Sequence, residues 1–553
     1  MRRKEPNPPE DTAGQEPRNS SGTNLVTTKP AMTQRLRPRR NRTGLLAFVG
    51  LTAAILACTR LSSLFRPSKL VEPWVGEGLA PPSQPLFTST ALPAITLLAL
   101  SPIPGTTYGT PTPDPTRQPP VLRELAEDYV VRRGDTLARI AARFGVAVEQ
   151  IMAANGILNP DLLAVGQMLT IPPQIPLSPG PSFKMIPDSE LVYGPASALL
   201  DLPGFVAGWD SALSAYQEEV EGRILSGQEI VQLVAEGYSV NPRLLLALVE
   251  FQSGFVRQRN LTDVQRTYPA GWLSPGYEGL FRQLSWAADQ FNAGFYRWLA
   301  GWNGPFLLSD GNVAPPGPGI NAGTAAVQYL LAQLLPADAW RSAASEGGLY
   351  QTYVTLFGSP FELRVEPLLP PDLAQPGLQL PFEPGKVWSF TGGPHAGWGN
   401  WGAWAAIDFA PPGEPLGCVV SNEWVVAMAD GLVDRADQGQ VIQDLDGDGL
   451  EQTGWVLFYL HIESRERVQP GSFVRAGDRI GHPSCEGGVS SGTHVHLARK
   501  YNGVWIDADG PLPFEMEGWV TASSGSVYDG SLSRGGVVLE ACSCRNASNQ
   551  ISR

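Results

Sequence analysis

Apolar and polar residues alternate at every second position over much of the C-terminal third of the chain, which is the period of a β-strand. Residues 454–462 (GWVLFYLHI) place Leu457 and His461 on one face and Phe458 on the other. From residue 386 onward, short runs of this kind are separated by turns that contain glycine and proline. This pattern predicts an all-β domain with an antiparallel sheet at 386–516.

The pattern changes to helical spacing in residues 185–365. Three segments carry it: 241–255, 284–299 and 321–335. The first (NPRLLLALVEFQSGF) is apolar all round, as in a buried helix. We therefore expect an all-α domain at 185–365, which a proline-rich linker at 366–385 separates from the β-domain.

Residues 127–173 combine both periods in one small unit. A strand at 129–131 is followed by helices that begin near Leu137 and Val148, and a strand at 166–172 closes the unit. This β-α-α-β order, with the segments GDTL and IMAAN, closely resembles a LysM domain; a generic small α/β domain is the alternative. The resemblance implies binding to N-acetylglucosamine polymers such as the glycan strands of peptidoglycan.

The N-terminal part of the chain carries export signals rather than a fold. Residues 1–43 are polar and charged, and we expect them to be disordered. The apolar run 44–58 follows a basic flank, which predicts a signal peptide or membrane anchor at 44–60, although the run is shorter than the roughly 20 residues that span a bilayer. Either Cys58 carries a lipid or the segment is a plain signal anchor. The proline-rich linker 61–126 then extends from the membrane, and the rest of the chain is extracytoplasmic, whether anchored or secreted.

Charge excludes one class of function. Ten Lys/Arg against four Asp/Glu in residues 1–42 leave the rest of the chain near −19, within a total of −13. A chain this acidic outside its leader is not expected to bind nucleic acid.

Four cysteines follow the leader, in a compartment where disulfides form. They are Cys418, Cys485, Cys542 and Cys544. Four cysteines allow three pairings, and of these we favour a Cys418–Cys485 bridge within the β-domain.

A candidate metal site lies in residues 491–500 (SGTHVHLARK). His494 and His496 are two positions apart, so both imidazoles point to the same face of a strand. Asp408 lies between two apolar neighbours and faces away from the core, and His395 precedes it. His395, Asp408 and His496 would leave a fourth tetrahedral position for water, which is typical of catalytic zinc. The alternative is a strand with two solvent-facing histidines.

These residues resemble the lysostaphin/LytM-type zinc endopeptidases of peptidoglycan, together with His461 in FYLHI, His494 in GTHVH and a repeated V-x-x-G spacing between them. The resemblance implies one Zn²⁺ ion bound by His395, Asp408 and His496. It also implies that His461 and His494 assist catalysis.

The spacing between His395 and Asp408 departs from the common family pattern. Twelve residues separate them instead of three, which is similar to the β-lytic members. Trp398, Trp401 and Trp404 in this loop either line a substrate cleft or pack in the protein interior.

The first functional hypothesis is an exported bacterial zinc metalloendopeptidase that hydrolyses peptide cross-links of peptidoglycan and is targeted by LysM. The alternative is a non-catalytic LytM-like scaffold or regulator that binds the cell wall.

The segment 241–255 is similar to the catalytic helix of lysozyme-like lytic transglycosylases. Gln252 stands where that family has its catalytic glutamate, and an amide cannot donate the required proton. Glu250 would point elsewhere on the helix. We therefore expect a degenerate lysozyme-like domain that binds glycan or acts as a spacer.

Three further features carry weaker signals. Asp444, Asp446 and Asp448 resemble the start of a Ca²⁺ loop, but the twelfth position is a tryptophan, so an Asp-Gly hairpin tip is the alternative. We expect His482 to be structural. The C-terminal extension 517–553 carries no chemistry that its sequence identifies.

Overall fold

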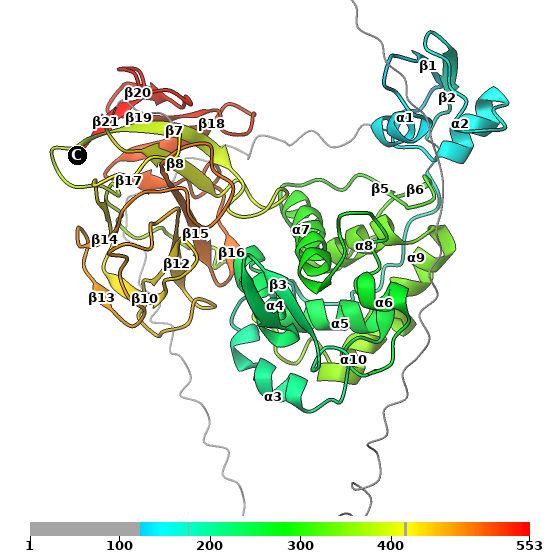
Figure 1. Cartoon of the computed structure of the whole chain (residues 1–553), viewed down its shortest axis with the longest axis horizontal. Coiled ribbons are helices and arrows are strands. Elements are labelled where there is room, and N and C mark those ends of the chain that lie inside the picture. Colours follow the sequence, from blue (N-terminus) through cyan, green and yellow to red (C-terminus); the bar gives the residue numbers. More distant parts are fainter. Residues whose placement is uncertain (1–121, 175, 414–416) are drawn as a thin grey trace, which may run out of the picture. The chain divides into compact units, whose positions relative to one another are not determined.

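The computed structural model describes residues 122–174, 176–413 and 417–553. The predictions for residues 1–43 and 44–60, including Cys58, lie outside the described residues. Figure 1 colours the described chain from cyan, for the small N-terminal unit, through green to yellow and red. In this part of the chain, every helix is too short or too polar to cross a bilayer.

The small N-terminal unit has the expected β-α-α-β order. Its elements are β1 (Glu127–Val130), α1 (Leu137–Phe144), α2 (Val148–Asn155) and β2 (Met168–Ile171). The two strands are antiparallel neighbours. The Asn155 amide joins α2 to β2, because its Nδ2 donates to the Thr170 carbonyl and its Oδ1 accepts from the Thr170 amide.

The middle of the chain is helical. Its helices are α3 (Leu202–Ala207), α4 (Gly227–Tyr238), α5 (Pro242–Ser253), α6 (Asp263–Thr267), α7 (Leu280–Leu299), α8 (Ala322–Leu334), α9 (Ala337–Ala343) and α10 (Gln351–Phe357). Helix α5 is almost entirely buried, as its all-round apolar sequence predicted. Helices α7 and α8 approach closely at Gly294, where a Cβ atom would lie 2.6 Å from the Ala326 Cα.

The prediction of an all-α domain is wrong in detail, because two short hairpins interrupt the helices. They are β3 (Gln217–Val220) with β4 (Arg223–Ser226), and β5 (Phe306–Leu307) with β6 (Val313–Ala314). The first turn consists of Glu221 and Gly222, with φ of 50° and 78°. Two positive φ angles in a two-residue turn match the right-handed twist of a hairpin.

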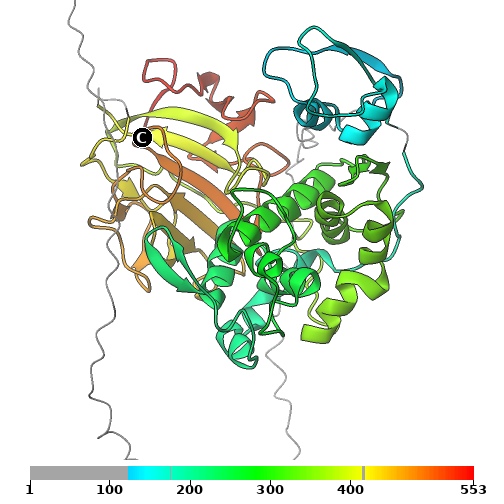
Figure 2. The same ribbon diagram turned by 45° about the vertical axis from the view of Figure 1, so that its right-hand side comes forward.

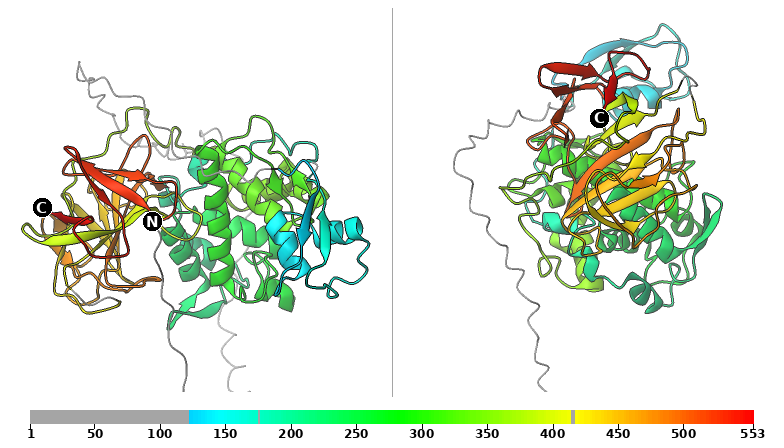
Figure 3. Two further views of the ribbon diagram at one scale, coloured as in Figure 1. Left: turned by 90° about the horizontal axis from the view of Figure 1, so that it is seen from above. Right: turned by 90° about the vertical axis from the view of Figure 1, so that its left-hand side faces the viewer.

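The C-terminal third forms an antiparallel nine-stranded sheet, as the alternating sequence predicted. The strand order is β13-β10-β11-β12-β15-β8-β7-β21, with β16 paired to β15. The bounds are β7 (Val387–His395), β8 (Ala406–Ala410), β10 (Gly431–Arg435), β11 (Gln440–Asp444), β12 (Trp455–Leu460), β13 (Phe473–Val474), β15 (Val495–Tyr501), β16 (Val504–Trp505) and β21 (Gln550–Ser552). Figure 2 and the right-hand view of Figure 3 show the yellow and orange strands side by side.

Both faces of this sheet are buried. Leu457 and Tyr459 of β12 belong to a core within the β-domain. Phe458 and Leu460, on the opposite face, belong to a hydrophobic core that continues into the helices of 185–357. The helical region and the β-domain therefore share one core across this face of the sheet.

The C-terminal extension is part of the β-domain. Strands β17 (Glu515–Met516), β18 (Trp519–Ser523), β19 (Gly530–Arg534) and β20 (Val537–Glu540) form a second antiparallel sheet. Strand β21 then pairs with β7 at the edge of the large sheet. The strands β9 (Val425–Val426) and β14 (Arg479–Gly481) form a separate pair.

Candidate metal centre

Three adjacent strands position the candidate ligands. Asp408 on β8 lies directly opposite His496 on β15 and opposite Gly392 on β7. A Cβ atom on Gly392 would lie 2.4 Å from the Asp408 Oδ2, so the carboxylate occupies the space that a larger residue would fill. The pairing of β7 with β8 shifts register between Gly392 and His395, and His395 ends β7 beside Asp408.

The three side chains converge on one point. The Asp408 Oδ1 lies 3.4 Å from the His395 Nε2 and 3.3 Å from the His496 Nδ1, and the two nitrogens are 3.0 Å apart. Tetrahedral zinc ligands at about 2.0–2.1 Å stand about 3.3 Å from one another. The Asp408 Oδ1 is buried and makes no hydrogen bond within the described chain. An orphaned carboxylate oxygen between two imidazoles fits a bound cation.

Backbone carbonyls determine which nitrogen of each ligand faces this point. The His395 Nδ1 lies 2.8 Å from the Gly393 oxygen, and the His496 Nε2 lies 3.0 Å from the Gly397 oxygen. Each of these nitrogens donates to its carbonyl, so the other ring nitrogen keeps its lone pair for a metal ion. Such outer-shell hydrogen bonds orient metal-binding histidines.

Electrostatics favour an ionised carboxylate here. Burial alone would raise the pKa of Asp408, but the neighbouring imidazoles of His395 and His494 lower it well below its usual value. Burial opposes protonation of His395, yet the Asp408 charge raises the pKa of that imidazole. For His496, burial dominates and lowers the pKa, which keeps the ring neutral.

Two further imidazoles lie beside the three. The His494 Nδ1 lies 2.7 Å from the Gly492 oxygen, and its Nε2 lies 3.7 Å from the Asp408 Oδ1. The His461 Nδ1 lies 2.8 Å from the backbone carbonyl oxygen of Glu486. The ring centroids of His461 and His494 are 4.4 Å apart. Burial, with His494 and His496 nearby, lowers the pKa of His461 to about 3. The structure therefore brings together all five residues that the sequence singled out.

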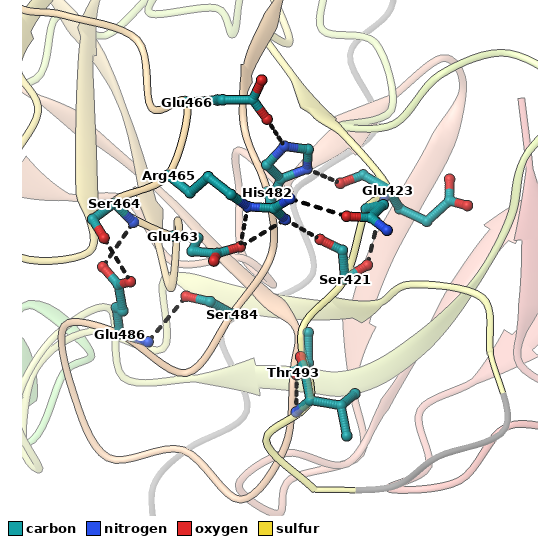
Figure 4. A network of polar contacts seen from close by, with 12 residues as sticks. Ser421, Glu423, Glu463, Ser464, Arg465, Glu466, His482, Ser484, Glu486 and Thr493 are labelled. Carbon is teal, nitrogen blue, oxygen red and sulfur yellow. Dashed lines mark hydrogen bonds and ion pairs between the residues drawn. The ribbon is translucent and has the colours of Figure 1, made fainter.

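A polar network fixes the loops that carry these two histidines (Figure 4). Arg465 donates to the Glu463 carboxylate and to the Ser421 carbonyl. Ser464 donates to the Glu486 carboxylate from both its amide and its hydroxyl. The predicted Cys418–Cys485 disulfide is confirmed and ties the same loops together. The remaining two cysteines, Cys542 and Cys544, pair with each other.

His482 belongs to this network and not to the metal centre. Its ring lies against Trp424, with centroids 3.9 Å apart. Its Nδ1 lies 2.8 Å from the Glu423 carbonyl oxygen and its Nε2 lies 2.9 Å from Glu466 (Figure 4). Both ring nitrogens are engaged, which agrees with the structural role expected of His482.

Two neighbours of the centre were missed by sequence reasoning. The Tyr528 ring, from the C-terminal extension, stacks on His395 with centroids 4.2 Å apart. The Gly397 carbonyl contacts His496, as described above. A lone tyrosine in a Gly/Ser-rich segment and a backbone oxygen leave no pattern in the sequence.

The tryptophans of the loop between β7 and β8 pack against other parts of the protein. Trp398 contacts the rings of Tyr238 and Phe458. The Arg297 guanidinium lies 4.7 Å from the ring centroid of Trp401. The packing alternative describes Trp398, whereas Trp401 is 47% exposed and is not an interior residue.

The weaker predictions turn out differently. The carboxylates of Asp444, Asp446 and Asp448 lie close together, but Asp444 accepts hydrogen bonds from the amides of Asp446, Gly447 and Gly449 within its own turn. This is the hairpin-tip alternative, and the predicted Ca²⁺ site is unsupported. In the helical region, the buried Glu250 accepts from the amides of Val256 and Arg257 and pairs with the Arg257 side chain. These bonds engage both carboxylate oxygens of Glu250 within the protein.

Comparison with known families matches two regions. Residues 129–172 match the LysM domain, and residues 184–371 match the family described as LasA, N-terminal domain. The latter match does not confirm the lysozyme-like interpretation of the helical region.

Individual proteins of known name also match the chain. Protease LasA of Pseudomonas aeruginosa (strain UCBPP-PA14) is 26% identical over 345 residues, covering 58% of this chain and 75% of LasA. The beta-lytic metalloendopeptidase of Achromobacter lyticus is 29% identical over 166 residues, which cover 28% of this chain and 41% of that protein. Among solved structures, the M23 metalloprotease pseudoalterin is 24% identical with a TM-score of 0.27, covering 32% of this chain and all of that one. The resemblance to a LytM-type peptidase with a LysM domain is confirmed by the LysM, LasA and beta-lytic metalloendopeptidase matches.

Proposed function

We propose that this protein is a zinc metalloendopeptidase that hydrolyses peptide cross-links of bacterial peptidoglycan outside the cytoplasm. The observation that carries the proposal is the convergence of His395, Asp408 and His496 around the orphaned Asp408 Oδ1. Two relatives are named as a protease and a metalloendopeptidase, which supports the reaction class.

The donor set suits zinc. Two neutral imidazole nitrogens and one carboxylate are the ligands of many catalytic zinc sites, in which the fourth position is left to water or substrate. A zinc ion bound there supplies a water of lowered pKa and polarises the substrate carbonyl.

His461 and His494 would carry out the proton transfers. Both direct Nδ1 to a backbone carbonyl, so Nε2 is the nitrogen that serves the reaction. A neutral imidazole accepts a proton from the attacking water and later donates it to the leaving amine. The second imidazole can donate a hydrogen bond to the substrate oxygen, as its negative charge develops, only in the imidazolium form, with Nε2 protonated as well as Nδ1. Because the rings lie side by side, one substrate amide can contact both.

The LysM domain supplies the substrate class. In this proposal it binds the glycan strands, which keeps the peptide stems at a high local concentration near the metal centre. The N-terminal apolar segment exports the chain and anchors it to the membrane.

The test is digestion of purified peptidoglycan by the full-length protein, followed by mass spectrometry of the released muropeptides. The wild-type protein should release peptides with new amino termini, and His496→Ala should release none. Asp188→Ala, which removes a partly buried carboxylate of the helical region, is the control and should retain activity. A wild-type protein that binds peptidoglycan without cleaving it supports the alternative of a wall-binding scaffold.

A further inference from the structure

The loop between β7 and β8 supports a zinc ligand through its backbone. The Gly397 carbonyl accepts from the His496 Nε2 at 3.0 Å, and the Gly397 amide donates to the Ala403 carbonyl at 3.1 Å. A Cβ atom on Gly397 would lie 2.8 Å from the Trp505 ring. The orientation of His496 therefore depends on where this short loop, 397–403, places one carbonyl.

The tip of the same loop is bound by the helical region. The Asp289 Oδ1 on α7 accepts from the amides of Asn400 and Trp401 at 2.9 and 3.2 Å. Gly399 has a φ of 71°, and a Cβ atom there would lie 2.7 Å from the Asp289 Oδ1. The loop backbone thus lies directly against a carboxylate that is only 7% exposed.

Helix α7 contacts the β-domain at two further points on the same face. Tyr296 and Arg297 follow Asp289 by seven and eight residues, which is two helical turns. The Tyr296 hydroxyl accepts from the Trp505 amide at 3.0 Å, and the Arg297 guanidinium lies over the Trp401 ring. One helix face therefore holds the loop tip and the strand β16 beside it.

Burying a carboxylate at position 289 carries a desolvation cost. Burial raises the pKa of the Asp289 carboxyl, and the Asn400 and Trp401 amides oppose that rise. A buried carboxylate is stable only when hydrogen bonds replace its water. Here the compensating donors are backbone amides of a loop in the other domain, so the energetic cost of burying Asp289 is linked to the loop conformation.

From this geometry we propose that Asp289 is a positioning residue of the metal centre, which acts through the loop 397–403 to orient the zinc ligand His496. In this proposal the helical region supports the geometry of the metal centre and is more than a spacer. This inference rests on the proposed zinc site.

The test compares the full-length wild-type protein with Asp289→Ala and Asp289→Asn. Zinc affinity is measured by competition with a chromophoric chelator, and ligand geometry is measured by the visible absorption of the Co²⁺-loaded protein. Loss of outer-shell support costs 10–100-fold in metal affinity in known sites, so Asp289→Ala should weaken zinc binding by about tenfold and shift the Co²⁺ spectrum. Asp289→Asn keeps an oxygen that accepts from both amides and should restore most of the affinity.

Asp188→Ala is the matched control. Asp188 is a partly buried carboxylate of the helical region that accepts from the Gly323 amide and the Asn321 side chain, both at 2.7 Å. Its loss should lower the melting temperature without changing zinc affinity. If Asp289→Ala does not fold, Gly399→Ala is the second variant. Its new methyl group would lie 2.7 Å from the Asp289 Oδ1 and must displace the loop or the carboxylate, so it should also weaken zinc binding.

The outcomes separate the two proposals. A wild-type protein that binds no zinc contradicts the proposed function itself. A wild-type protein that binds zinc, with folded Asp289→Ala and Gly399→Ala variants of unchanged affinity and unchanged Co²⁺ spectrum, overturns only the role of Asp289.

Discussion

Asp408 and His496 face each other directly across the antiparallel strands β8 and β15, with the Asp408 Oδ1 3.3 Å from the His496 Nδ1. The backbone hydrogen bonds of the sheet thereby set the distance between two proposed ligands from positions far apart in the sequence. Sites built on strands are more exact than sites on mobile loops. The metal centre should therefore be largely formed before the ion binds.

Removal of the metal should lower stability without unfolding the sheet. Binding to the folded state alone stabilises a protein by about 2.7 kcal/mol when the free ligand is at one hundred times its Kd. Chelator-treated protein should thus lose about 2.7 kcal/mol of unfolding free energy relative to protein in zinc at that level. Urea titrations followed by tryptophan fluorescence measure the difference. Equal stabilities with and without zinc would contradict a site that binds the ion in the folded state.

Gly392→Ala should damage the metal centre without touching a ligand. The new methyl group would lie 2.4 Å from the Asp408 Oδ2 and must displace the carboxylate. We expect zinc affinity to fall by about 10–100-fold, the range for altered support of a ligand. Gly377→Ala is the control, since a Cβ atom there meets no atom within 4 Å. Chelator competition compares the two variants, and equal affinities would contradict the close contact.

Replacing Cys418 and Cys485 together by serine should slow catalysis more than it weakens metal binding. The disulfide joins loops next to Glu486 and Thr493, which neighbour the contacts of His461 and His494. It closes a separation of 67 residues, so its loss should cost about 4 kcal/mol of stability. We expect a lower kcat and an unchanged zinc Kd. A matching loss of zinc affinity would show that the bridge supports the metal ligands instead.

The lowered pKa of the buried Glu451 carboxyl should make the free energy of unfolding depend on pH. Burial would raise its pKa, but Arg435 and Lys500 outweigh burial and lower it below the ordinary value of 4.5. A depressed carboxyl pKa contributes stability that is present above 4.5 and is lost as the pH falls through the folded-state value. Glu451→Gln should destabilise the protein by about 3 kcal/mol at pH 7, because it removes the carboxylate that pairs with the buried Lys500 and one of the carboxylates beside Arg435. Urea titrations from pH 7 to pH 3 should show the difference between wild type and variant shrinking below pH 4.5; a constant difference would contradict the charge assignment.

The sequence was sufficient to bring the five candidate site residues together and to predict the LysM unit and the antiparallel sheet, but not the two hairpins of the helical region. Strand alternation placed His494 and His496 on one face and set Asp408 apart from its apolar neighbours, because a period of two is a local property. The strand–helix–helix–strand order of the LysM unit was equally local.

Features that depend on tertiary packing could not be predicted. Phe458 and Leu457 are both apolar, and nothing local shows that one packs with the helical region and the other within the β-domain. Tyr528 reaches His395 only because the C-terminal extension folds back along β7. Asp289 reads as an ordinary polar position within a helix, and its partners are backbone amides more than one hundred residues away.

The most direct measurement is anomalous X-ray diffraction at the zinc edge from crystals of the zinc-loaded full-length protein. The account predicts one strong peak about 2.0–2.2 Å from the His395 Nε2, the Asp408 Oδ1 and the His496 Nδ1, and no peak there in crystals of His496→Ala. A peak at any other set of residues, or none between these three side chains in zinc-loaded crystals, would contradict it.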